Sequence, residues 1–373
     1  MQLRLIVRFA ALAIAAGSPA AIVWADGIVG IPSAGPQLCG FYGADENGEL
    51  VDTSSPTVLS HTSNSANDEV TLFAPQSTAA GCGCEVASCC EEDRPFGYFA
   101  LVGYEAFRGI PDGSWENNGL HTGANFGTRL GELSDWTGIG AQIGGTVGIY
   151  NWSGTGYRMD HQNIAETQGF LTYGLFRKAN ENSPWSASLV HDWMFNHNFS
   201  VMAEDPTLSQ LRGQVGYAVS DWNEIGLWGA CRTGSDSRQV PAFGRVTWQA
   251  INQLNVYWHY KWGIGQPDTW LWVGVPERDR LAGNNSLGDY LAGALANCPF
   301  SERVSLYALV TYMHPSASAG PAGSLEEAWS FAIGLSLYPG RDARSKTVKG
   351  RGWLPQLPVA TNGYFLVDAS DTY

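Results

Sequence analysis

The chain of 373 residues carries a formal net charge of -14, and only 15% of its residues are charged. The acidic balance argues against nucleic acid as a partner, because neutralising phosphates requires clustered Lys and Arg. The charged fraction is low against the ~25% typical of soluble domains, whereas Gly and aromatic residues are abundant, with 45 Gly and 15 each of Trp, Tyr and Phe. This composition disfavours an ordinary soluble surface, and the length suits one large barrel or two smaller domains.

Residues 1–25 have the pattern of a secretory signal peptide. Arg4 and Arg8 precede an apolar stretch, and Val23 and Ala25 occupy the positions of a cleavage site. A transmembrane anchor is the alternative, but a Gly-Ser-Pro interruption leaves the stretch short of the ~20 apolar residues that a spanning helix needs. We therefore expect export and cleavage near Ala25.

Residues 26–95 precede the predicted barrel and are rich in Gly, Ser, Thr, Asn and Pro with weak periodicity, which predicts a flexible segment. Four of the seven Cys of the chain lie close together in it: Cys82, Cys84, Cys89 and Cys90. In an exported protein this grouping favours disulfides. A zinc site is the alternative, because thiolates at short spacing bind zinc. We predict no cofactor.

Residues 96–339 contain a run of predicted β-strands. Twelve segments lie near 98–110, 119–131, 138–150, 168–178, 185–195, 208–219, 223–233, 252–264, 268–275, 288–297, 303–313 and 327–338. In the second segment, Leu120 and Phe126 belong to an apolar set that alternates with a polar set containing His121 and Asn125. Strict alternation places the two sets on opposite faces of a strand. The alternation is less clear in 185–195, 268–275 and 288–297. The predicted fold is all-β, a closed antiparallel up-and-down β-barrel of about 12 strands.

The connections between these segments favour a membrane barrel over a soluble β-sandwich, which alternates in the same way. Every odd-numbered connection is longer than every even-numbered one. Long extracellular loops and short periplasmic turns give this pattern when both ends of the barrel lie on the periplasmic side. Trp residues also gather toward strand ends, as in interfacial girdles. They are Trp136, Trp152, Trp185, Trp222, Trp262 and Trp329.

The polar sets predict which side chains face the lumen. The candidates are His121, Asn125, Arg129, Gln142, Arg212, Gln214, Arg232, Asn255, His259 and Lys261. Cationic side chains predominate over acids in this group, although Glu224 is a counterexample. Rings of Arg or Lys favour anions in pores, so small polar or anionic solutes are the expected partners inside, and membrane lipid is the expected partner outside. The alternative is that these charges pair and fill the lumen, since barrels of ~8 strands are filled and those of ~16–18 strands leave a channel.

Residues 340–373 form a basic, Pro-containing tail, which we expect to lie outside the barrel. The Gly-spaced strands behind a signal peptide resemble bacterial outer-membrane β-barrel proteins. Together with the tail motifs Gly352-Trp353-Leu354-Pro355 and Asn362-Gly363-Tyr364-Phe365-Leu366-Val367, the chain from about residue 95 onward also resembles an uncharacterised family of exported proteins from planctomycete bacteria. The resemblance implies an outer-membrane location and brings no activity with it. Outer-membrane barrels commonly end on an aromatic residue of the last strand, whereas here the tail follows Tyr338.

Three functions remain open. The leading hypothesis is a narrow porin-like channel or a structural envelope protein, without enzymatic activity. The second is a soluble secreted β-sandwich or barrel that binds a ligand or an envelope polymer. The third is an outer-membrane lipid hydrolase built on His314 and Ser316, but no Asn that could orient the base follows before Asn362. A metal site formed by His191, Asp192 and His197, with Glu204 and Asp205 later in the same loop, is a weaker alternative to a solvated polar loop.

Overall fold

The computed structural model describes most of the chain from residue 94 onward. The described ranges are 43–44, 50–51, 94–112, 115–152, 165–241, 244–263, 265, 267–277, 288–315, 328–340, 342–344, 348–349 and 352–370. β1 (Gly43–Ala44) and β2 (Leu50–Val51) pair with each other and belong to a different unit from the later strands. The predicted signal peptide, most of the predicted pre-barrel segment and its four clustered Cys lie outside the described residues. In these ranges, no helix is long and apolar enough to cross a membrane.

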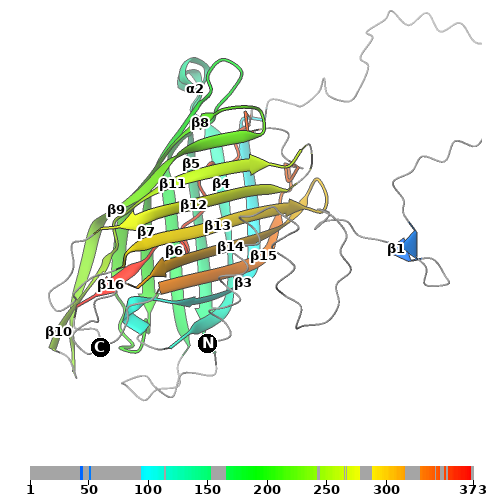
Figure 1. The fold of residues 1–373 in the computed structure, drawn as a ribbon. Helices are drawn as coiled ribbons and strands as arrows, with labels where there is room; N and C mark the ends of the chain where they lie inside the picture. Colours follow the sequence, from blue (N-terminus) through cyan, green and yellow to red (C-terminus); the bar gives the residue numbers. More distant parts are fainter. Residues whose placement is uncertain are drawn as a thin grey trace, which may run out of the picture. The chain divides into compact units, whose positions relative to one another are not determined.

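Antiparallel strands close into a barrel of 12 strands (Figure 1). The strands are β3 (Phe96–Arg108), β4 (Asn117–Arg129), β5 (Ile139–Tyr150), β6 (Glu166–Arg177), β7 (Trp185–His197), β8 (Thr207–Ala218), β9 (Asn223–Val240), β11 (Gln253–Lys261), β12 (Asp268–Pro276), β13 (Tyr290–Pro299), β14 (Val304–His314) and β15 (Ala328–Leu337). Neighbours in sequence pair with one another, β15 pairs with β3, and β9 pairs with β11. The predicted closed up-and-down barrel is confirmed.

The wall of the barrel is polar on its buried face and apolar on its exposed face. In β4, Leu120 and Phe126 are 47% and 39% exposed, whereas His121 and Asn125 are 4% and 1% exposed. Large exposed apolar side chains recur along the other strands. Such a continuous apolar exterior is typical of a lipid-facing surface. Of the predicted girdle, Trp136, Trp152, Trp185 and Trp262 are exposed, Trp222 is half-buried, and Trp329 is buried.

The two ends of the barrel differ in the length of their connections. At the end that we call the turn end, the connections include 178–184, 219–222, 262–267 and 300–303; at the opposite loop end they include 151–165, 198–206, 277–289 and 315–327. The first pair breaks the predicted contrast, because 130–138 is no shorter than 109–116. The reason is that β4 ends at Arg129, earlier than predicted, and the short helix α2 (Glu132–Thr137) follows it.

The loop end carries a small sheet that the sequence did not predict. β9 continues past its pairing with β11 and returns as β10 (Gly244–Ala250). β10 also pairs with β16 (Val367–Ala369) near the end of the tail. Figure 1 shows α2 and β10 at opposite ends of the barrel. The tail therefore reaches the loop end.

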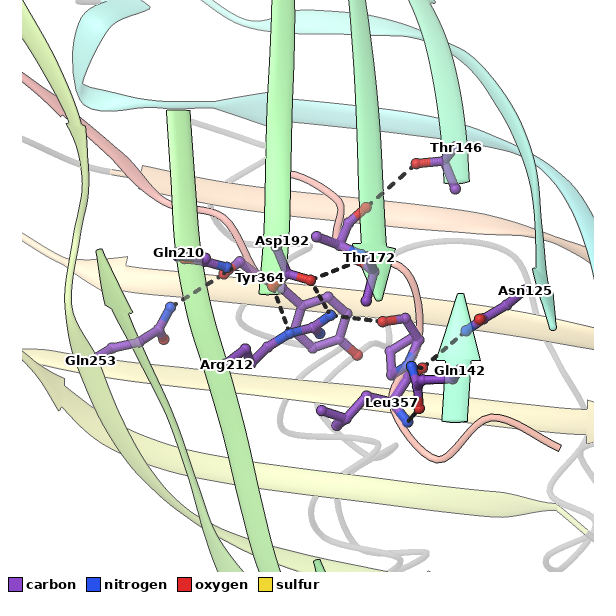
Figure 2. Close-up of polar contacts among 12 residues, drawn as sticks. Asn125, Gln142, Thr146, Thr172, Asp192, Gln210, Arg212, Gln253, Leu357 and Tyr364 are labelled. Atoms are coloured by element: carbon purple, nitrogen blue, oxygen red, sulfur yellow. Dashed lines mark hydrogen bonds and ion pairs between the residues drawn. The ribbon is translucent and has the colours of Figure 1, made fainter. Parts of the chain in front are cut away.

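The prediction that the tail lies outside the barrel is wrong. Ala343 and Val348 donate backbone hydrogen bonds to the carbonyl oxygens of Glu302 and Asp221, which lie in connections of the turn end. From there, residues 353–366 run through the lumen to β16 at the loop end (Figure 2). The inner wall leaves room for this path, because a side chain at Gly97 or Gly127 would collide with the backbone of residues 353–355.

The physical reason for this path is complementarity between the wall and the tail. Buried amides and hydroxyls of the wall need hydrogen-bond partners, and the tail backbone supplies them. The tail also carries apolar residues that would be exposed to water outside the barrel, such as Val359 and Phe365, which are 2% and 1% exposed here. The basic residues at the start of the tail made the whole tail look solvent-exposed in the sequence, although its later part is apolar.

Candidate functional site: a lumen occupied by the C-terminal segment

We call residues 353–369 the lumenal segment, and its first anchor is a pair of amides. The Gln142 side chain donates a hydrogen bond to the Leu357 carbonyl oxygen at 2.9 Å and accepts bonds from the backbone N–H groups of Gln356 and Leu357, each at 3.2 Å. Asn125 donates a second bond to the same carbonyl at 2.9 Å. Alternation in β4 and β5 aims both amides inward. They replace the water that would otherwise satisfy this stretch of backbone.

The second anchor is a buried ion pair between β7 and β8. Arg212 Nε and Nη2 lie 2.9 and 3.1 Å from the two carboxylate oxygens of Asp192, and the side chains are 1% and 0% exposed. The same guanidinium donates a 2.7 Å bond to the Pro358 carbonyl oxygen (Figure 2). A charge that is buried to this extent requires a partner, because desolvation of an unpaired ion costs several kcal/mol. The pair therefore fixes Arg212 where it meets the lumenal segment.

Hydroxyl and amide groups continue the contacts toward the loop end. The Thr172 hydroxyl donates to Asp192 at 2.7 Å and accepts a bond from the Ala360 N–H at 3.0 Å. Gln210 and Gln253 donate to the Tyr364 carbonyl oxygen at 3.2 and 3.4 Å. The lumenal segment is thus held along its length by side chains of several strands (Figure 2).

The last part of the lumenal segment enters an apolar cluster. Phe365, Val367 and Ala369 pack with Trp248 of β10 and Met194 of β7, and each of the five is at most 5% exposed. Apolar burial stabilises roughly 25 cal/mol per Å², so this cluster is a firmer anchor than the separate hydrogen bonds. The segment therefore has a polar part near the turn end and an apolar part near the loop end.

The structure places most of the predicted lumen residues on the buried face. Those that are at most 7% exposed are His121, Asn125, Gln142, Arg212, Gln214, Asn255, His259 and Lys261. Three of them contact the lumenal segment directly, namely Asn125, Gln142 and Arg212. The other two predicted residues are more exposed, since the side chains of Arg129 and Arg232 are 34% and 30% exposed and pair with Asp135 and Glu277.

Sequence reasoning recognised one buried acid of the wall, Glu224, and missed the others. Glu105, Glu166 and Asp192 are at most 3% exposed, like the predicted cations. Asp192 pairs with Arg212, and His259 pairs with Asp268. The predicted excess of cationic side chains in the lumen is therefore offset by carboxylates. The signal for Asp192 was the weak alternation of 185–195, where Ser186, Ser188 and Asp192 share one face.

The other predicted sites are only partly within the described residues. The four clustered Cys lie outside the described residues, and Cys231, which does not belong to that cluster, is a free and exposed thiol. His197 lies 3.1 Å from Asp205, but no group of three or more His, Cys, Asp or Glu that could hold a metal occurs among the residues described. His314 stacks on Tyr290, whereas its predicted partner Ser316 falls outside the described ranges.

Comparisons with known proteins identify a family for this chain. None of the curated proteins matches this sequence. Among solved structures, an outer-membrane channel from Pseudomonas putida F1 is 12% identical with a TM-score of 0.42, and the match covers 68% of this chain and 100% of that one. The NanC porin is 11% identical with a TM-score of 0.37, covering 64% and 98%. The Salmonella typhi outer membrane phospholipase dimer with bound calcium is 11% identical with a TM-score of 0.36, covering 64% and 90%.

At these identities and scores, the solved structures identify no activity for this chain. The resemblance to exported planctomycete proteins also stays a prediction. A family model, by contrast, matches residues 98–367, which include all of the barrel strands except the first two residues of β3, and the lumenal segment as far as the first residue of β16. The chain belongs to this family, a family of unknown function designated DUF6666.

Proposed function

We propose that this protein is an outer-membrane β-barrel that acts as a narrow channel for small polar solutes and is closed at rest by its own C-terminal segment. The observation that carries the proposal is the route of residues 353–369 through the lumen. Polar side chains from several strands of the wall form hydrogen bonds with the backbone of these residues. The apolar exterior of the wall supports a membrane location, and the signal-peptide pattern supports export.

The chemistry of the contacts favours a removable closure over a permanent one in the part of the lumen near the turn end. There the wall binds the segment through hydrogen bonds to its backbone, at Leu357, Pro358 and Ala360. Exchange of a neutral bond of this kind for bonds to water costs only ~0.5–1.5 kcal/mol net, and exchange of the charged bond from Arg212 costs ~1.5–3 kcal/mol. Once the segment leaves, water can solvate the polar side chains of the inner wall. A barrel with a purely structural role does not require such a wall, whereas a channel does.

Conductance in planar bilayers tests the proposal. The full chain is compared with a variant truncated after Gly340, which lacks the lumenal segment, and folding of both is checked by heat-modifiable migration in gels. We expect little current from the full chain and stepwise currents from the truncated one. A truncated barrel that folds and inserts but carries no current contradicts the channel and leaves the structural envelope role.

The rival class is a soluble secreted barrel that binds a ligand or an envelope polymer. Its exposed apolar side chains, such as Val102 at 48% and Val256 at 57%, would then face water, which soluble monomers avoid over large areas. Cell fractionation separates the two. We expect the protein in the detergent-extracted outer-membrane fraction, and release into the soluble fraction without detergent contradicts the membrane location.

A further inference from the structure

The inner wall of the barrel has two chemically different sides. Most of the amide and hydroxyl side chains that contact the lumenal segment come from β4 to β8, and Gln253 of β11 is the exception. Aromatic side chains come from β9, β11 and β12, where Trp228, Tyr257 and Trp272 are at most 7% exposed and belong to one cluster with Tyr364. A lumen with a polar side and an aromatic side suits a solute that has both a ring face and a polar edge.

Tyr364 of the lumenal segment occupies the aromatic side. Its ring stacks on Trp272 with centroids 6.0 Å apart and planes 26° apart, and it meets Trp228 edge-on at 6.0 Å and 74°. The Arg212 guanidinium lies over the same ring, 4.8 Å from its centroid. Figure 2 shows this ring beside the Arg212 side chain. These three contacts use the face and the edge of a π system, so an aromatic ring satisfies them best.

Tyr364 is separate from the apolar anchor of the segment. The next residue, Phe365, belongs to the apolar cluster at the loop end, whereas Tyr364 belongs to the aromatic cluster of the wall. Its carbonyl oxygen, and not its ring, accepts the bonds from Gln210 and Gln253. The ring is thus an occupant of the wall site that can be exchanged without loss of those backbone contacts.

We propose that Arg212, Trp228 and Trp272, which we call the ring site, bind the aromatic ring of a small neutral solute of the size of phenol, and that Tyr364 occupies this site in the closed state. Asp192 neutralises Arg212, so the site offers its guanidinium face to a ring and has little net charge for an anion. The inference rests on the proposed channel, because a solute in the ring site removes the contacts of the Tyr364 ring, so that fewer contacts hold the lumenal segment and its release is favoured. The attached Tyr364 competes at high effective concentration, so solutes bind the intact chain weakly.

The test uses the full chain with Tyr364→Ala, in which the ring site is vacated, and 4-fluorophenol observed by ¹⁹F NMR. Stacking on Trp272 shifts the fluorine signal, and cyclohexanol serves as a competitor of similar size with a hydroxyl group but without a π face. We expect 4-fluorophenol to bind the variant at least about tenfold more tightly than cyclohexanol, given the usual strength of stacking and cation–π contacts. The matched control, Tyr364→Ala with Trp272→Leu, corrects for partition into detergent and is expected to lose the shift.

Equal affinity for the two solutes, or an equal shift with the control, overturns the ring site. If Tyr364→Ala does not fold, the chain truncated after Gly340 presents the same three side chains and takes its place in the same titration. This outcome is distinct from failure of the channel, because binding is measured without any current. Selective binding by a barrel that carries no current would leave the ring site intact and remove the channel.

Discussion

Replacement of Arg212 by Met tests whether the lumenal segment excludes water from the ion pair between Arg212 and Asp192. The side chains of Arg212 and Asp192 are 1% and 0% exposed, so Arg212→Met leaves a buried carboxylate without its counter-charge. Removal of one partner from such a pair costs ~3–5 kcal/mol of unfolding free energy. The variant also loses the bond from the charged guanidinium to the Pro358 carbonyl oxygen, which adds ~1.5–3 kcal/mol. Equilibrium urea unfolding in lipid vesicles measures the loss.

The pair Arg129–Asp135 provides the matched control. Its side chains are 34% and 57% exposed, so Arg129→Met is expected to cost at most ~1 kcal/mol. The double variant Arg212→Met with Asp192→Asn is expected to regain part of the loss, because no buried charge is then left unpaired. If Arg212→Met costs no more than Arg129→Met, the ion pair is hydrated and the packed lumen is refuted.

Three further predictions concern the exterior, a connection and the end of the tail. Ile143→Arg on the exposed face of β5 is expected to destabilise the protein by ~2–4 kcal/mol in vesicles, whereas Asn182→Arg in an exposed turn has little effect; equal effects in urea unfolding argue against lipid at that face. Burial raises the pKa of Asp112, in a connection of the loop end, from 3.8 to about 6, so its contribution to stability is fully present below pH 3.8 and is lost as the pH rises through 6. Asp112→Asn cannot ionise and therefore does not lose this stability. The unfolding free energy of the variant minus that of the wild type should grow by ~3 kcal/mol from pH 4 to 8. A difference that does not depend on pH contradicts the burial of Asp112. An epitope tag fused to the C-terminus should bind antibody on intact cells and a tag inserted after Gly340 should not, and the opposite pattern excludes passage of the segment from the periplasmic side to the outside.

The barrel could be predicted from the sequence because alternation is a local signal. Each face of β4 is encoded within a dozen neighbouring residues, and the lengths of most connections can be read from the spacing between alternating segments. The weak strand β7 shows the limit of this signal. Its outward positions include His191 beside Leu189 and Trp193, so the two faces differ little in polarity, and Asp192 was not recognised as a lumenal residue.

The lumenal segment could not be predicted because its contacts are long-range. Gln142 and Leu357 are 215 positions apart in sequence, and no periodicity links them. The tail also has the composition of a loop, with Gly, Pro and Asn between apolar residues. Inward glycines such as Gly127 were a usable signal in retrospect, since a barrel wall that lacks side chains there leaves space for another chain segment.

Photo-crosslinking from position 357 tests the occupied lumen most directly. A benzophenone amino acid replaces Leu357, the cells are illuminated with the protein in its native membrane, and the adducts are mapped by mass spectrometry. The structure predicts adducts within one chain, to wall peptides that include Asn125 and Gln142. Adducts to other proteins, or none to the wall in a folded barrel, would show that the segment lies outside and that the lumen is closed by something else.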